Sequence, residues 1–460
     1  MRSVRAVAAV VAIGILPGGA AALQLPPDSA ILGMIRERVE AKAVTGIVAG
    51  VMGPDGKARV VAYGPAREGG PALDARSVLE IGSVSKTFTA AILADMVAKG
   101  EVKLDDPVAK YLPPTVKVPS RNGKVITLLD LATQTSGLPR LPSNLQPKDP
   151  ANPYADYTPE KMYEFLSSYE LPRDPGETYE YSNLGMGLLG FALARRAGGD
   201  YEAVLKRRVL GPLGMSNTGI ALTPDLRARL APGHDPSGAV VANWDFPTLA
   251  GAGAIRSDME DMLKYLRANM FPESSPVAKE LATTHEPRRP VGGGGMRIGL
   301  AWHVLPRPDG EIVWHNGQTA GYHGFIAFRP GTKTGVVLLT NTGADIDDIG
   351  MHILDAAIPL RKPSPPVARK EITLPPEVLD RYVGEYRFAP TFSIVVSREG
   401  PQLFAQPTGQ QRVPLFAETE TDFFLKVVDA QLTFTRDSAG KVTGAVLHQA
   451  GGNAPGAKVK

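Results

Sequence analysis

The stretch Ile81-Gly82-Ser83-Val84-Ser85-Lys86-Thr87-Phe88-Thr89 decides the fold of this chain. A turn is expected to deliver Ser83 to the start of a helix. Apolar residues at helical spacing follow at once, and Gly100 supplies a stop: Phe88, Ile92, Leu93, Met96 and Val97. The pattern predicts one well-packed helix with a serine at its N-terminus.

Ser83 and Lys86 are three residues apart, so their side chains share one face of a helix. A desolvated lysine amine can take the proton of a serine hydroxyl, and a helix N-terminus stabilises an oxyanion beside it. S-x-x-K also arises by chance about once or twice in a chain of this length. A second copy, Ser438-Ala439-Gly440-Lys441, is interpreted as a hairpin tip. The catalytic interpretation therefore needs partner residues elsewhere in the chain.

The first partner motif is Tyr181-Ser182-Asn183, which follows the turn signal Pro175-Gly176-Glu177. In a locally extended segment, Tyr181 and Asn183 would project to the same side. A phenol can pass a proton between nucleophile and leaving group, and an amide can orient a lysine and a substrate.

The second partner motif is Trp314-His315-Asn316-Gly317-Gln318-Thr319, which opens a strand-like stretch. Such a strand offers a backbone N–H to an oxyanion and an edge to an extended substrate. His315 adds a titratable donor, and Gly317 permits a close approach to the backbone. The tripeptide Lys333-Thr334-Gly335 lies in a predicted turn between two strands and is set aside.

These three motifs, in this order and spacing, resemble those of the class C β-lactamase and DD-peptidase superfamily. The resemblance spans roughly residues 28–360 and includes residues 127–139 (TLLDLATQTSGLP) and 212–215 (PLGM). It implies an α/β (α+β), β-lactamase/transpeptidase-like fold with an antiparallel sheet of five or more strands flanked by helices. The order of predicted elements, with strands at both ends and helices between, also favours an antiparallel sheet covered by segregated helices.

The resemblance implies a role for each motif residue. Ser83 would be the acylated nucleophile, Lys86 its amine partner, Tyr181 a proton relay and Asn183 the orienting amide. The N–H groups of Ser83 and Gln318 would form the oxyanion hole, and the substrate-binding strand would comprise His315, Asn316, Gly317 and Gln318. Whether Lys86 or Tyr181 is the general base stays open, since the two would titrate as a coupled pair.

The chain departs from the usual β-lactamase motifs at one position that bears on substrate binding. β-Lactamases of this class usually carry Lys-Thr-Gly where this chain has His315-Asn316-Gly317. A lysine is a permanent cation for a substrate carboxylate, whereas a histidine of ordinary pKa is partly charged at neutral pH. The expected function is an acyl-enzyme hydrolase for β-lactams, D-alanyl-D-alanine-type peptides or both. A carboxylesterase is the first alternative. A slow-turnover penicillin-binding sensor is the second, and the complete Ser, Lys, Tyr and Asn set argues against it.

Four regions are expected along the 460 residues. Residues 1–22 read as a signal peptide, with Arg2 and Arg5, an apolar run too short to span a bilayer, and a small-residue cleavage site. The serine hydrolase domain would cover residues 23–360, a Pro-rich linker 361–376, and a β-sheet or β-barrel domain 377–460. The mature protein would be periplasmic or secreted and would not span the membrane.

Composition narrows the partners. The net charge is +3 and is dispersed, so no basic tract indicates nucleic acid binding. Absence of cysteine excludes disulfides, thiolate metal sites and a cysteine nucleophile. No cofactor or metal is implied, because the remaining histidines show no ligand spacing. The expected partner is a small-molecule or peptidoglycan-peptide substrate, and the oligomeric state is left open.

Overall fold

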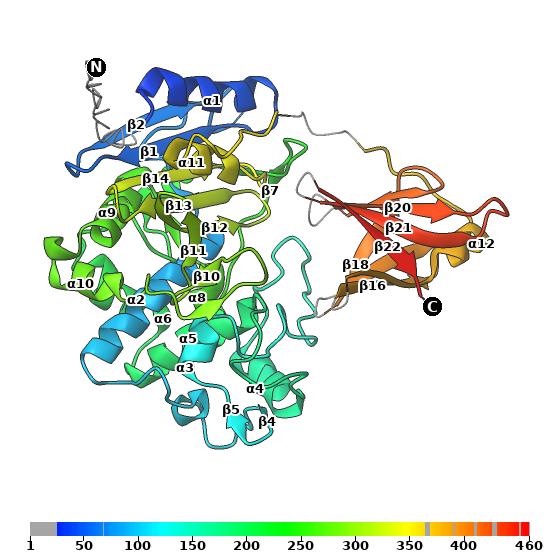
Figure 1. The fold of residues 1–460 in the computed structure, drawn as a ribbon, viewed down its shortest axis with the longest axis horizontal. Coiled ribbons are helices and arrows are strands. Elements are labelled where there is room, and N and C mark those ends of the chain that lie inside the picture. The colour runs from blue at the N-terminus through cyan, green and yellow to red at the C-terminus, as the bar shows by residue number, and fades with distance from the viewer. Residues whose placement is uncertain are drawn as a thin grey trace, which may run out of the picture.

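The computed structural model describes residues 25–67, 69–363, 369–389, 392–408, 412–425, 430–449 and 452–459. The expected signal peptide, residues 1–22, lies outside these ranges. Figure 1 shows a larger part built of helices and a sheet, and a smaller C-terminal part built mainly of strands. No helix in the described ranges is both long and apolar enough to cross a membrane.

The larger part is built on an eight-stranded sheet in the order β2-β1-β14-β13-β12-β11-β10-β9. Every neighbouring pair is antiparallel, as expected. The strands are β1 (Ile47–Met52), β2 (Ala58–Tyr63), β9 (Arg289–Pro290), β10 (Arg297–Ile298), β11 (His303–Arg307), β12 (Gly310–Gln318), β13 (His323–Arg329) and β14 (Thr334–Thr340). Short antiparallel pairs lie outside this sheet: β3 (Leu79–Glu80) with β8 (Arg256–Ser257), β4 (Ser120–Arg121) with β5 (Lys124–Val125), and β6 (Gly233–His234) with β7 (Val240–Val241).

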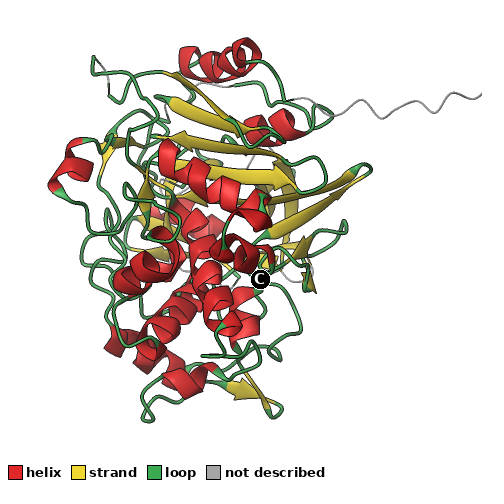
Figure 2. Ribbon diagram, turned by 90° about the vertical axis from the view of Figure 1, so that its left-hand side faces the viewer, coloured by secondary structure: helices red, strands yellow, loops and turns green. Residues whose placement is uncertain are grey.

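Helices cover both faces of this sheet (Figure 2). Val336 and Leu338 of β14 pack with α1 (Asp28–Glu40) and α11 (Asp347–Leu354). Val337 and Leu339 belong to the larger core on the opposite face. Successive strand residues point to opposite faces, so one apolar strand serves two cores. The expected α/β (α+β) sheet with flanking helices is confirmed.

Most of the helices contribute side chains to the larger core. They are α2 (Ser85–Ala98), α3 (Leu128–Ala132), α4 (Pro159–Ser168), α5 (Asn183–Arg196), α6 (Tyr201–Leu205), α8 (Ala250–Gly253), α9 (Met259–Met270) and α10 (Pro276–Ala282). Helix α7 (Pro224–Ala228) contributes no residue to this core. Single turns of 3₁₀-helix lie at Gly82–Val84, Val108–Tyr111 and Pro272–Ser274, and a π-helical turn at Lys206–Leu210.

Helix α2 is the centre of this core. Every residue from Ser85 to Met96 is buried, as expected for a helix that packs on all sides. Gly100 follows its C-terminus with φ +68°, a conformation that favours glycine. Ser83 lies in the 3₁₀ turn Gly82–Val84, two residues before α2 begins. The structure thus places the serine in a tight turn that leads into the helix.

The C-terminal part is a closed antiparallel barrel of eight strands. They are β15 (Gly384–Ala389), β16 (Phe392–Glu399), β17 (Gln402–Pro407), β18 (Val413–Ala417), β19 (Asp422–Phe424), β20 (Ala430–Arg436), β21 (Val442–Gln449) and β22 (Gly452–Lys458), preceded by α12 (Pro376–Leu379) and a 3₁₀ turn at Asp380–Tyr382. Closure leaves no exposed sheet edge. Its apolar core includes Tyr382, Tyr386 and Phe434.

The segment expected to be a linker divides between the two parts. Arg361 forms ion pairs with Asp345 and Asp348 of the larger part. Ile372 donates its N–H to the carbonyl of Ala417 at 2.9 Å, which attaches it to the barrel. Residues 364–368, between these contacts, lie outside the described ranges.

Candidate active site

Ser83 and Lys86 meet as the helical spacing predicts. The Lys86 Nζ lies 2.8 Å from the Ser83 Oγ. It also lies 2.8 Å from the Asn183 Oδ1 and 2.7 Å from the Ala252 carbonyl oxygen. The turn before α2, the start of α5 and helix α8 thus converge on one amine. The site requires tertiary structure, because Ala252 belongs to none of the sequence motifs.

The Lys86 side chain is fully buried. Burial disfavours the ammonium form and, with the positive charge of Arg140, holds the lysine pKa well below its ordinary value. The Lys86 Nζ donates to three oxygens, those of Ser83, Asn183 and Ala252. Once it loses a proton, the amine can keep two of these bonds and accept the Ser83 hydroxyl proton on its lone pair. Lys86 is therefore poised as a base.

Tyr181 is held in its protonated form. Burial raises its pKa to about 12, while Arg140 and a hydrogen bond with Ser83 act in the other direction. The Lys86 Nζ lies 4.8 Å from the centre of the Tyr181 ring. At neutral pH the phenol keeps its proton, so it can give one to a leaving group. The expected contact between Tyr181 and the serine–lysine pair is present.

Asn183 begins a helix rather than lying in an extended segment. Ser182 caps α5 by accepting the N–H of Gly185 at 2.8 Å. The Ser182 hydroxyl also donates to the carbonyl of Pro139 at 2.6 Å. The Asn183 Nδ2 donates to the Tyr154 hydroxyl at 3.3 Å. One side of the amide is thus held by Tyr154 while its oxygen holds Lys86.

Strand β12 passes directly beside the Ser83 turn. A Cβ atom added at Gly317 would lie 2.1 Å from the Ile81 carbonyl oxygen and 2.5 Å from the Ser83 nitrogen. One added at Gly82, which has φ +50°, would lie 2.6 Å from the Gln318 nitrogen. Two glycines therefore bring two backbone segments into direct contact. This contact places the backbone nitrogens of Ser83 and Gln318 on neighbouring segments.

The same strand offers an edge. Its pairing with β11 runs from Gly310 to Trp314, whereas its pairing with β13 continues to Gln318. Residues His315–Gln318 are thus paired within the sheet on one side only. An extended substrate could add to the other side by backbone hydrogen bonds.

Side chains on β12 alternate between the two faces. Gly317 faces the serine turn. Asn316 instead donates its Nδ2 to the Asp347 carboxylate, and the Gln318 amide donates to the Gly343 carbonyl at 2.8 Å. Asn316 and Gln318 can therefore contribute only backbone groups to the serine side of the strand.

His315 is on the serine side, yet the expectation that it is partly charged at neutral pH is corrected. It is 1% exposed, and burial together with His303 and Lys86 holds its pKa well below the usual value. Its Nδ1 donates to the Asn316 carbonyl, while its Nε2 has no partner among the described residues. His315 is neutral and offers a lone pair, not a cation.

Comparison with known proteins decides the family. Residues 32–357 match the family model described as Beta-lactamase. The chain belongs to the beta-lactamase family. It is a serine hydrolase of the class C β-lactamase and DD-peptidase superfamily, which confirms the resemblance seen in the sequence. Residues 368–455 match a separate model, described as a domain of unknown function, DUF3471.

Relatives in this family carry two kinds of name. The D-alanyl-D-alanine-carboxypeptidase/endopeptidase AmpH of Escherichia coli K12 is 32% identical over 302 residues, covering 62% of this chain and 77% of the relative. A Beta-lactamase of Pseudomonas fluorescens is 29% identical over 323 residues, covering 62% and 86%. A class C β-lactamase structure from Rhodobacter sphaeroides has a TM-score of 0.62 at 25% identity, covering 72% of this chain and 99% of that one.

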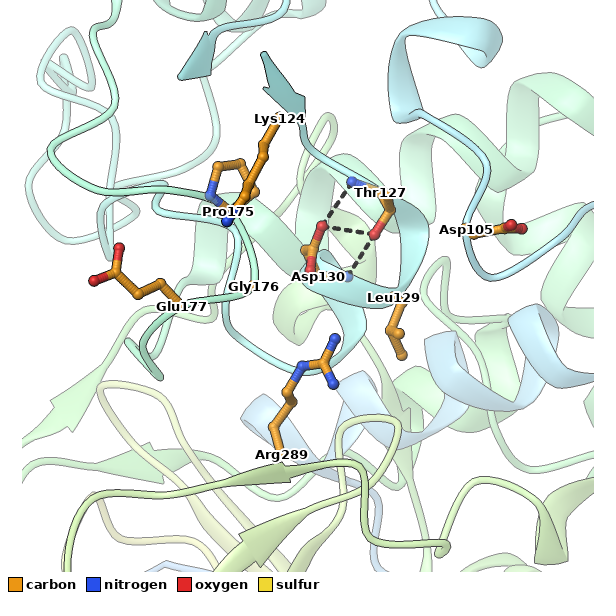
Figure 3. A pocket seen from close by; sticks show the side chains of 9 residues that line it. All are labelled: Asp105, Lys124, Thr127, Leu129, Asp130, Pro175, Gly176, Glu177 and Arg289. Carbon is orange, nitrogen blue, oxygen red and sulfur yellow. Dashed lines mark hydrogen bonds between the residues drawn. The ribbon is translucent and has the colours of Figure 1, made fainter. Parts of the chain in front are cut away.

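A pocket of about 440 Å³ lies away from these groups (Figure 3). Figure 3 shows Lys124 and Arg289 reaching toward it from opposite sides, with Asp130 held by Thr127. The lining is Asp105, Lys124, Thr127, Leu129, Asp130, Pro175, Gly176, Glu177 and Arg289. None of the candidate catalytic residues lines this pocket, and its charges are mixed.

One group of potential metal ligands arises only in the folded chain. Single ligand atoms of His323, Asp345 and Asp347 lie within 4.8 Å of one another, although the sequence shows no ligand spacing there. The His323 Nε2 already lies 2.7 Å from the Asp347 carboxylate, and Arg361 lies 2.9 Å from Asp345. These charges satisfy one another. We interpret the group as an ion-pair cluster behind β12.

Sequence reasoning missed four residues around the candidate site: Gln134, Arg140, Tyr154 and Ala252. Gln134 accepts the Ser182 N–H on its Oε1 at 2.8 Å. Gln134 and Arg140 flank the Thr-Ser-Gly-Leu-Pro stretch at 135–139, which was the one signal available in the sequence. Tyr154 and Ala252 lie in segments without a motif.

Proposed function

We propose that the protein is an exported serine hydrolase that cleaves β-lactams, D-alanyl-D-alanine-type peptides or both through an acyl-enzyme on Ser83. The observation that carries this proposal is the buried, low-pKa Lys86 amine 2.8 Å from the Ser83 hydroxyl. The names of relatives, both β-lactamase and carboxypeptidase/endopeptidase, support the substrate class.

In the proposed reaction, Lys86 takes the Ser83 proton as the Ser83 oxygen attacks the carbonyl carbon. The N–H groups of Ser83 and Gln318 receive the oxyanion. Tyr181 then donates its proton to the leaving nitrogen as the carbon–nitrogen bond breaks, and the proton that Lys86 took from Ser83 passes to the phenolate. Water then attacks the ester, giving the acid product and free Ser83. Lys86 is the base in this scheme, and Tyr181 is the acid.

Export rests on residues 1–22, whose charged start, apolar run and small-residue site are typical of a secretory signal. We infer that this segment is removed and that the mature protein is periplasmic or secreted. Mass spectrometry of protein recovered outside the cytoplasm should give an N-terminus near Leu23. An intact Met1 in that fraction would contradict cleavage.

The nucleophile is tested by replacing Ser83 with alanine. Ser83→Ala should lose turnover by several orders of magnitude and lose covalent labelling by a fluorescent penicillin or a fluorophosphonate. Ser438→Ala is the matched control, because Ser438 lies in the turn between β20 and β21 and should keep full labelling. Label retained in Ser83→Ala would overturn the assignment.

A carboxylesterase is the second candidate, and neutral His315 is the observation that favours it. Because a neutral His315 offers no cation, it gives anionic amides no electrostatic advantage in binding over neutral esters. Purified protein assayed with nitrocefin, a D-Ala-D-Ala peptide and p-nitrophenyl esters separates the two. Turnover of the esters alone would favour the esterase.

A further inference from the structure

Arg140 lies at the edge of the candidate site and is not used in the proposed reaction. Its side chain is exposed, and its Cζ lies 5.1 Å from the centre of the Tyr181 ring. The same ring is 4.8 Å from the Lys86 amine. The guanidinium is thus separated from the serine–lysine pair by little more than one aromatic ring, a span that a small peptide or a penicillin can cover.

The backbone of Arg140 is fixed to the catalytic elements. Its carbonyl accepts the N–H of Asn183 at 3.0 Å and that of Leu184 at 3.2 Å. The residue that holds Lys86 and the residue that bears the guanidinium are therefore bonded directly. The cation–π contact with the Tyr181 ring also holds the guanidinium near the site.

The charge of Arg140 is unpaired. Among the described residues, no carboxylate forms an ion pair with it. The positive charge of Arg140 lowers the pKa of four neighbouring groups: Lys86, Tyr154, Tyr179 and Tyr181. For Lys86 this adds to the effect of burial, whereas for the three tyrosines it opposes that effect. No carboxylate contributes to the pKa of Lys86, Tyr154 or His315.

The other basic groups of the site are buried, which disfavours their charged forms. Lys86 and His315 both have pKa values held well below their ordinary range by burial. Arg140 is exposed instead, and its guanidinium carries a permanent positive charge beside the Tyr181 ring. A site with one unpaired guanidinium and no opposing acid complements an anion.

We propose that Arg140 is the anion-recognition residue of this site and that preferred substrates carry a carboxylate bound by its guanidinium. The fork of N–H groups suits a planar carboxylate. This inference rests on the proposed function and deepens it by assigning substrate charge to one residue. The carboxylate could lie on the acyl side or on the leaving-group side of the scissile bond.

Three penicillins distinguish these sources. Carbenicillin differs from benzylpenicillin by one carboxylate on the acyl side chain. Benzylpenicillin methyl ester lacks the carboxylate on the leaving side. Second-order rate constants for acylation are measured by competition with a neutral fluorophosphonate for Ser83. Within each pair, effects of Arg140 on Lys86 cancel, because both compounds use the same base.

In Arg140→Ala, the preference for the carboxylate-bearing member should fall about tenfold in at least one pair, equivalent to roughly 1.4 kcal/mol. A change in the carbenicillin pair would place the recognised carboxylate on the acyl side, and a change in the methyl ester pair would place it on the leaving-group side. Arg140→Lys should keep an intermediate preference, since a lysine keeps the charge but not the fork. Arg227→Ala removes an equal charge from exposed helix α7 and should leave both ratios unchanged.

Ratios in Arg140→Ala within twofold of wild type for both pairs would overturn the inference while leaving the proposed function intact. Failure of every penicillin to acylate Ser83 in the wild type would instead overturn the β-lactam part of the proposed function. That result would also overturn the inference about Arg140, which rests on the proposed function. The two failures are thus distinguishable in one data set.

Discussion

Lys86 lies beside a hydroxyl, an amide oxygen and a carbonyl, and no carboxylate contributes to its pKa. A buried ammonium with only dipoles around it loses more hydration energy than those dipoles return. The amine consequently gives up its proton at a much lower pH than an exposed lysine does. Burial at one residue thus creates the base that the proposed chemistry needs.

A pH profile tests this state of Lys86. The kcat/KM for an uncharged substrate should rise with pH as Lys86 loses its proton and should reach its plateau well below the ordinary pKa of a lysine, because burial lowers the Lys86 pKa. Because the Tyr181 pKa is raised to about 12, the plateau should hold through moderately alkaline pH. A rate that still climbs tenfold per pH unit above pH 9 would show that Lys86 keeps an ordinary pKa.

His315 gives a second prediction at this scale. Since burial lowers its pKa, the KM of a carboxylate-bearing substrate should show no inflection from His315 between pH 6 and 8. His315→Gln, which keeps a neutral polar side chain, should leave the preference for anionic over neutral substrates within about threefold. A KM that rises through pH 6–8 in wild type and is flat in the variant would mean that His315 is charged.

At the scale of elements, the site depends on how closely β12 approaches the turn before α2. Gly317 and Gly82 face the backbone of the opposing segment with no room for a side chain. The strand is otherwise held by β11 from Gly310 to Trp314 and by β13 from Val313 to Gln318. The geometry of the oxyanion groups is therefore set by one close backbone contact.

Gly317→Ala should separate these segments, because its Cβ would lie 2.1 Å from the Ile81 carbonyl oxygen. We expect a loss of about 1–3 kcal/mol in the free energy of unfolding. Loss of an oxyanion donor should reduce kcat by roughly 100-fold or more. Gly331→Ala is the matched control in the turn before β14, since its Cβ would meet nothing within 4 Å. Equal behaviour of the two variants in melting and kinetic assays would refute the contact's importance.

At the scale of the whole molecule, the two parts have separate cores. The described residues of the barrel core all follow residue 371. Those of the two cores around the large sheet all precede residue 361. Each part therefore buries its own apolar side chains, as independent domains do.

A chain shortened after Pro363 should keep its fold and its hydrolysis of a small substrate. Ending there preserves Arg361, whose carbonyl accepts from Arg38 and whose guanidinium pairs with Asp345 and Asp348. Circular dichroism, thermal melting and kcat/KM against the full chain check this. Loss of solubility or activity would show that the barrel completes the hydrolase domain.

Much of the site follows from local sequence. The i, i+3 spacing determines that Lys86 can reach Ser83, because helical geometry puts both on one face. The alternating pattern after Trp314 predicts the strand, and Gly317 predicts its close approach. The sequence also predicts a β-sheet or β-barrel domain at residues 377–460, and the structure there is a closed barrel.

The protonation states and the charge of the site were decided by tertiary structure alone. His315 looks like an ordinary histidine in the sequence, and only its burial makes it neutral. Arg140 and Ala252 carry no motif, and only the convergence of α2, α5 and α8 brings them to Lys86. Sequence spacing fixes which groups share a helix or strand, since that depends on local geometry. Burial and long-range proximity depend on the packing of distant segments, and these two factors set the pKa of each group.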